Sequence, residues 1–308
     1  MTTLLNRKKQ KVDALAESAG TSLAADALKR MSRSPVAIIG AVIVLVFLVL
    51  SVIAPFITPK DPYKRYEELL DQLRPDNIPG PMPGFLLGSD ELGRDFFSRL
   101  LVGAQQSLVV GVGATLIGLV LGMLIGGAAG AFGGWVDSWL MRFTDIMLSI
   151  PSLLLAISIA ALASRGSQTT VIIAVAVTTV PIFARLLRGA MLAQRHSDHV
   201  LAATALGVKR KTIVFRHMLP NSLGPVIVQA TLTLATAIIE AASLSFLGLG
   251  DPDPARAEWG LMLGNSQRYI DVKPELAYFP AIAIIIVALG FTLLGESLRE
   301  ALDPKNRR

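Results

Sequence analysis

The sequence predicts an all-α integral membrane protein with six membrane-spanning helices. Of its 308 residues, 52% are hydrophobic and only 17% are charged, a balance too apolar for an ordinary soluble domain. Long apolar runs recur along the chain, each long enough to cross the hydrocarbon core of a bilayer as a helix. The chain contains no cysteine, which excludes disulfides and thiolate metal sites.

The first 35 residues are expected to form a tail that carries a short amphipathic helix at the membrane surface. Four basic residues lie between Arg7 and Lys11, and Ser22–Arg33 has helical spacing with basic side chains for anionic headgroups. The first span follows over residues 36–57, a run without charge that begins after Pro35.

Residues 58–106 are polar and rich in proline and glycine, and we expect them to lie outside the membrane on the extracytoplasmic side. Near the end of this segment, Asp90 is expected to cap a helix whose apolar face includes Leu92 and Phe96. The remaining chain divides into a five-helix core, residues 107–296, and a closing tail, residues 297–308.

The second span, Leu108–Phe132, contains far more glycine than a lipid-facing helix needs. Such glycines are typical of close contact between membrane helices. They are Gly111, Gly113, Gly118, Gly122, Gly126, Gly127 and Gly130.

The third span is expected over about residues 143–162, with an early bend at Pro151, and the fourth over about residues 170–187. Arg142 and Asp145 stand three residues apart before the bend, so an ion pair on one helix face is expected.

The fifth span, about residues 221–247, carries Glu240, an ionisable residue at membrane depth, and also Gln229. A carboxylate at that depth faces a cavity or a partner, so Glu240 either lines a translocation path or pairs with a neighbouring helix. The sixth span covers about residues 276–294.

Between the fourth and fifth spans, residues 195–219 form a basic interruption that predicts a helix, a glycine corner and a second helix. Asp198 is expected to cap the first helix, Gly207 to end it in the left-handed conformation, and Lys209–His217 to form the second helix before Pro220. A face of small residues beside basic ones predicts a docking surface for a partner; these residues are Ala202, Ala203, Ala205, Lys209, Arg210, Lys211 and Arg216.

The distribution of charge predicts that both tails and this loop face the cytoplasm. The first tail and residues 195–219 are basic, whereas the loop between the fifth and sixth spans is net acidic. The net charge of +6 is explained by these membrane-flanking residues, and nucleic-acid binding is not expected because no aromatic residues are interleaved with them.

Catalytic signatures are absent from the sequence, so we expect no enzyme activity. There is no GxxxxGK[ST] phosphate loop, no HExxH and no GxSxG, and therefore no cofactor is expected in this chain. His196, His199 and His217 share one segment, but their spacing is not that of a zinc site.

Three motifs carry a resemblance to a known family. Leu201-Ala202-Ala203, Gly207 and the ending FRHMLPN resemble the EAA loop of ABC-importer permeases, with Leu201 in place of the family's leading acid. LLGSDELGRDFFSRLLVGAQQSL and the run AASLSFLGLG followed by WGLML are similar to elements of the dipeptide, oligopeptide and nickel branch. The chain resembles the second, C-type permease of such an importer.

This resemblance implies a type I importer architecture in the bacterial inner membrane, with a related second permease, two ATPases that bind ATP and Mg²⁺, and an extracytoplasmic binding protein. The path would include Glu240 and Gln229. The cargo stays open among dipeptides, longer peptides, nickel complexes and haem. The ATPase contact implied comprises Leu201, Ala202, Ala203, Gly207, Lys209, Arg210, Arg216, Leu219 and Pro220.

Two other function classes stay in view. A secondary transporter or channel would work without ATPases, but such carriers usually show internal repeats or several ionisable residues at the membrane midplane, and here Glu240 stands alone. A membrane scaffold would transport nothing. Copurification of ATPase subunits separates the importer from both.

Overall fold

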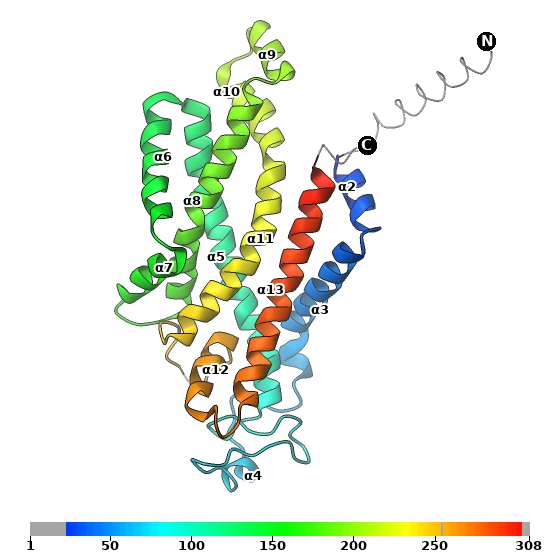
Figure 1. Ribbon diagram of the computed structural model, residues 1–308, viewed down its shortest axis with the longest axis vertical. Coiled ribbons are helices and arrows are strands. Elements are labelled where there is room, and N and C mark those ends of the chain that lie inside the picture. The colour runs from blue at the N-terminus through cyan, green and yellow to red at the C-terminus, as the bar shows by residue number, and fades with distance from the viewer. Residues whose placement is uncertain (1–22, 254, 304–308) are drawn as a thin grey trace, which may run out of the picture.

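The computed structural model describes residues 23–253 and 255–303, and the described chain forms an elongated bundle of helices (Figure 1). Within these residues β-structure is limited to four isolated bridges in the segment before the second long helix. The basic cluster Arg7–Lys11 lies outside the described residues.

Five helices are long and apolar enough to cross a membrane: α3 (Pro35–Ile57), α5 (Phe96–Phe132), α8 (Gln168–Gln194), α11 (Leu219–Phe246, continuous with the short segment from Arg210) and α13 (Glu275–Leu302). A bent pair of helices passes the same test when the two are taken together, which gives five or six candidate spans. Among the described residues the fold is therefore all-α, as the sequence predicts, and the bent pair lies where the third of the six predicted spans was expected.

The third passage is more strongly broken than expected. It consists of α6 (Gly134–Ser149) and α7 (Ser152–Ala161), which meet at 92°. The cause is Pro151, which has no N–H and pushes the preceding Ile150 into an extended conformation, so α6 stops at Ser149. The bend expected at Pro151 is therefore a break between two helices, and the first of them begins at Gly134 rather than near residue 143.

The second long helix begins at Phe96, and its cap differs from the prediction. Asp95 is the N-cap, and its carboxylate accepts a hydrogen bond of 2.9 Å from the Ser98 N–H. Asp90 instead stabilises a turn, since its carboxylate accepts from the N–H groups of Leu92 and Arg94. Gly93 in the left-handed conformation separates this turn from the helix, so Asp90 does not cap it.

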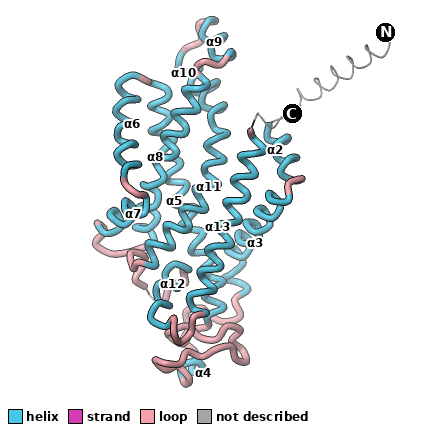
Figure 2. Tube along the Cα trace, in the orientation of Figure 1, coloured by secondary structure: helices cyan, strands magenta, loops and turns pink. Residues whose placement is uncertain are grey.

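The bundle has two different ends (Figures 1 and 2). One end carries α9 (Asp198–Ala205), α10 (Arg210–Thr212), α2 (Leu23–Met31) and the C-terminal end of α13. We call it the α9 end. The opposite end, which we call the loop end, carries residues 58–95 with α4 (Glu67–Leu70), and residues 247–274 with α12 (Trp259–Ser266).

The contact between α5 and α8 is built on glycine. A Cβ atom at Gly118 would lie 1.8 Å from Thr179 Oγ1, one at Gly122 would lie 2.5 Å from the Phe183 Cβ, and one at Gly126 would lie 2.2 Å from the Ala184 carbonyl oxygen. No other residue type allows the two helices to come so close. Facing them, Phe183, Leu187 and Met191 of α8 are fully buried.

This packing predicts a sharp difference between two adjacent glycines. Gly126→Ala forces a methyl group into the α8 backbone, and we expect it to lower stability by about 1–3 kcal/mol, the usual cost of overpacking. Gly127→Ala meets only Leu187 Cδ2 at 3.7 Å and gains helix propensity, so stability should stay equal or rise slightly. Thermal unfolding of both variants in one detergent measures the difference; equal melting temperatures would contradict the packing.

Candidate functional site

Residues 195–219, which we call the connecting loop, fold as the sequence predicts at their glycine corner. Gly207 has φ +74°, and it ends α9 in a Schellman motif. The Val208 N–H donates to the Ala203 carbonyl at 3.1 Å and the Gly207 N–H to the Thr204 carbonyl at 3.0 Å. The corner thus depends on a residue that adopts a left-handed backbone without strain.

Two details of the loop differ from the prediction. Ser197 occupies the N-cap position of α9, and Asp198 is its first helical residue, where a carboxylate favours the helix dipole. The second helix does not stop before Pro220. α10 leads through a π-helix, Ile213–Met218, directly into α11. The wider π-turn, in which the Leu219 N–H donates to the Val214 carbonyl, accommodates a proline that has no N–H to give.

The loop presents an exposed surface around α9 and the glycine corner. Leu201, Ala202 and Gly207 are exposed on it, and so are Lys209, Arg216 and Pro220. Ala203, only 7% exposed, packs inward and is not part of the small-residue face, while Leu219 is half-buried.

Two apolar side chains on this surface were missed by the sequence analysis. Leu206 is 83% exposed and Phe215 is 69% exposed. The exposure of Leu206 could have been predicted from its position directly before the glycine corner, because the side chain of this C-cap residue turns outward. Leu206 directly follows α9, whereas Phe215 belongs to the π-helix and lines a cleft beside α5. Exposed apolar side chains with basic neighbours are typical of contact surfaces.

Arginines fasten the connecting loop to the end of α5. The Arg210 guanidinium donates to the carbonyls of Ala131 (2.7 Å) and Phe132 (2.9 Å), the last residues of α5. Arg195 donates to the Gly130 carbonyl at 3.1 Å. The last carbonyls of a helix have no partner within it, and the helix dipole also favours a cation there. Arg210 therefore binds within the chain rather than standing free on the surface.

Ion pairs join α6 to α8 at the same end. Arg188 binds Asp137 through two hydrogen bonds of 2.9 and 2.6 Å, and Arg185 pairs with Asp145. The expected pair between Arg142 and Asp145 is wrong, because Asp145 faces α8, and a contact between helices replaces one along a single helix.

The two polar residues predicted within the fifth span make different contacts. The Glu240 carboxylate accepts a hydrogen bond of 3.0 Å from the Thr178 hydroxyl of α8. Gln229 donates to Thr233 on its own helix at 3.2 Å. Both side chains are half-buried, and the structure does not bring them together.

Two of the three histidines approach each other on the connecting loop. The rings of His199 and His217 lie 6.4 Å apart, and the Asn221 side chain bonds both the His199 ring, at 3.2 Å, and the His217 carbonyl, at 2.7 Å. The described part of the chain holds no group of three or more side chains suited to a metal ion.

At the loop end, one arginine holds three segments together. Arg99 of α5 donates to the carbonyls of Pro62, Ala255 and Arg256 and pairs with Asp90 at 3.2 Å. Asp90 also binds Arg94 at 2.6 Å, and all three side chains are buried. The motif residues that the sequence singled out thus tie residues 58–95 and 247–274 to the start of α5.

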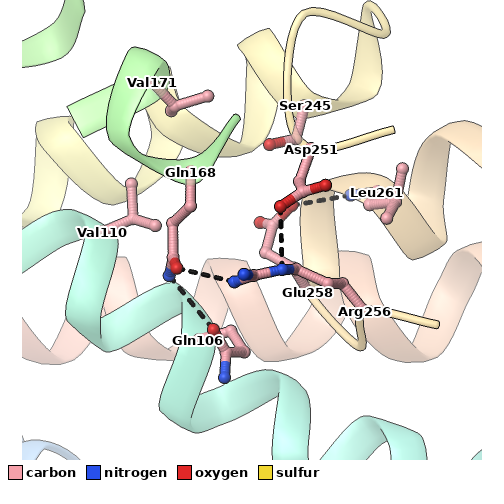
Figure 3. A pocket seen from close by; sticks show the side chains of 9 residues that line it. All are labelled: Gln106, Val110, Gln168, Val171, Ser245, Asp251, Arg256, Glu258 and Leu261. Carbon is pink, nitrogen blue, oxygen red and sulfur yellow. Dashed lines mark hydrogen bonds and ion pairs between the residues drawn. The ribbon is translucent and has the colours of Figure 1, made fainter. Parts of the chain in front are cut away.

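Beside this cluster, a polar network surrounds a cavity of about 20 Å³, large enough for one water molecule (Figure 3). Arg256 pairs with Asp251 at 2.8 Å and donates to Gln168 at 2.7 Å, and Gln168 donates to Gln106 at 3.1 Å. The network links α5, α8 and the loop before α12. No short sequence motif predicts this network, because its members lie far apart in the sequence.

Glu258 lines the same cavity and caps α12. Its carboxylate accepts from the N–H groups of Gly260 (2.9 Å) and Leu261 (3.0 Å). Burial raises the pKa of Glu258, and the hydrogen bonds from Gly260, Ser245 and Leu261 only partly oppose that rise.

With this geometry in place, comparison with known proteins decides the family. Residues 118–308 match the family described as the inner membrane component of binding-protein-dependent transport systems, and residues 22–77 match the N-terminal transmembrane domain of oligopeptide transport permease C. The chain belongs to this permease family. It is thus a multi-pass membrane permease of a bacterial ABC importer, in which separate ATPase subunits hydrolyse ATP.

The names of similar proteins agree with this family assignment. The permease is 42% identical to the dipeptide transport system permease protein DppC of Alkalihalophilus pseudofirmus, over 91% of this chain and 89% of that protein. It is 38% identical to the glutathione transport system permease protein GsiD of Pectobacterium atrosepticum, over 90% of this chain and 89% of that protein.

Solved structures share the fold. The MetNI methionine ABC transporter in an inward-facing conformation matches 67% of the permease and 97% of its own chain, with a TM-score of 0.56 and 19% identity. An amino acid ABC transporter solved with histidines matches 65% of the permease and 92% of its own chain, with a TM-score of 0.52 and 16% identity. The prediction of an ABC-importer permease is confirmed.

Glu258 predicts a pH dependence of stability. Its pKa in the folded permease exceeds its unfolded value, so its contribution is complete below the unfolded pKa and is lost as pH rises through the folded pKa. Melting temperatures measured from about pH 4 to about pH 8 should therefore fall less steeply with pH in Glu258→Gln than in the wild type. Glu296→Gln, at an exposed position, should keep the wild-type slope. Parallel slopes for all three proteins would contradict the buried carboxyl.

Proposed function

We propose that the permease imports short peptides or peptide-like compounds and that ATPase subunits drive it through the connecting loop. The observation that supports this most directly is the attachment of the loop to α5 by Arg210 and Arg195. A push on α9 would therefore move the end of a helix about 55 Å long, at 1.5 Å per residue over 37 residues. That helix in turn packs against α8 through its glycines.

Within the loop, we assign different roles to the residues of the proposed contact. Leu201, Ala202, Lys209 and Arg216 would contact the ATPase together with the exposed Leu206 and Phe215. Ala203 and Leu219 would support the surface from beneath, Gly207 and Pro220 would shape it, and Arg210 would anchor it. With Leu201 at the position of the family's acid, this part of the contact would be apolar rather than ionic.

The orientation follows from charge. The α9 end, with the basic residues of the connecting loop, would face the cytoplasm, and the loop end would face outward. A binding-protein-dependent permease receives its cargo from a binding protein, and the loop end would be the surface that it meets.

We further propose that the permease pairs with a related second permease and that two ATPases bind the pair. ATP and Mg²⁺ would be held by the ATPases alone, without a cofactor in this chain and without nucleic acid. Glu240 would lie near the path between the permeases, held by Thr178 until the cargo passes. Dipeptide and glutathione permeases among the relatives favour a peptide cargo over nickel complexes or haem.

Gly207 offers the direct test. Gly207→Val should uncouple uptake from ATP hydrolysis, because a β-branched residue at φ +74° costs about 1–2 kcal/mol and so shifts the population of the loop conformation about five- to thirtyfold. Gly207→Asn is the matched control, since asparagine tolerates this conformation. Uptake of a labelled dipeptide and ATPase activity are measured in proteoliposomes of the whole complex.

Uptake should fall about five- to thirtyfold in Gly207→Val and stay near the wild-type level in Gly207→Asn, with both variants inserted normally. Equal uptake by both variants would count against the coupling role. Uptake by this chain without any ATPase would instead support a secondary transporter or channel.

A further inference from the structure

We propose that the permease binds an anionic phospholipid in an apolar cleft beneath the connecting loop. The cleft has a volume of about 720 Å³ and lies between the last turns of α5 and the segment from Arg210 to Leu219. It shares Arg210 and Phe215 with the connecting loop described above, but none of the contacts proposed so far fills it.

The walls of the cleft suit an acyl chain. Its floor contains Gly127 and Ala128 of α5, which leave the helix backbone uncovered, and Met191 of α8 closes the back. Leu124, Phe132 and Phe215 line its sides and are 65%, 67% and 69% exposed. In a chain that spans a membrane, apolar side chains this exposed contact acyl chains or another helix.

The mouth of the cleft suits a phosphate. Two of its lining residues are cations, Arg210 and Lys211, and both belong to α10, which lies at the α9 end of the bundle (Figure 1). Arg210 is already fixed by its bonds to the Ala131 and Phe132 carbonyls, so its position is set before any headgroup arrives. An apolar cleft with two cations at one end matches the shape and charge of an anionic lipid.

A protein helix fits the cleft less well. Covering Arg210 and Lys211 with an apolar helix would bury cations without a counter-charge, which is costly. A phospholipid supplies that counter-charge and keeps its headgroup in water. Bound there, it would contact both α5 and the segment from Arg210 to Leu219 and so bridge them.

The test is a titration of phosphatidylglycerol into the complex purified in detergent, read out by native mass spectrometry, with phosphatidylcholine as the competitor. Lys211→Gln removes one cation and should weaken phosphatidylglycerol binding about fivefold, since one basic residue near a headgroup contributes about 1 kcal/mol. Gly127→Leu fills the floor of the cleft and should abolish the retention of phosphatidylglycerol. A Cβ atom there meets only Leu187 Cδ2 at 3.7 Å, so the fold should tolerate it.

Gly189→Leu is the matched control, because it adds the same bulk to α8 at a site with nothing within 4 Å, and it should bind as the wild type does. Equal retention of phosphatidylglycerol by all four proteins would overturn the proposal. So would a Gly127→Leu variant that retains the lipid but loses the second permease, because the cleft would then be a protein interface.

Discussion

The structure depends on the close approach of α5 and α8. Lipid tails are as apolar as leucine side chains, so membrane helices gain little from hydrophobic burial against each other and rely on dense packing and hydrogen bonds. Gly118, Gly122 and Gly126 allow the two backbones to come into contact. The side chains of α8 that face them are fully buried. The other helices are placed relative to this pair.

Polar contacts attach other segments to α5 and α8 at both ends of the bundle. At the α9 end, Arg188 and Arg185 bind α6 to α8, and Arg210 and Arg195 bind the connecting loop to α5. At the loop end, Arg99 gathers residues 58–95 and 247–274 around the start of α5. Force applied to the loop therefore has a continuous structural route to the opposite end of the molecule, without any flexible link in α5 itself.

Much of this was predictable from sequence because the signals are local. Charge-free runs located the spans, the glycines of α5 indicated a close helix contact, and Gly207 indicated the corner that the structure contains. What failed depended on distant partners. The sequence predicted that Asp145 pairs with Arg142, but in the structure it pairs with Arg185 of α8. The sequence also predicted that Asp90 caps a helix, but its carboxylate pairs with Arg94 and Arg99. The network of Arg256, Gln168 and Gln106 spans three segments, and no local spacing could announce it.

The central claim is that α5, α8 and the connecting loop move as one body. The chain contains no cysteine, so Leu206→Cys and Leu124→Cys give it two labelling sites, one in the loop and one in α5, when it is labelled before assembly with its partners. Both positions are exposed. We expect the distance between the labels to stay constant when a non-hydrolysable ATP analogue drives the assembled complex between states. A change in that distance larger than the range of the label rotamers would contradict the claim.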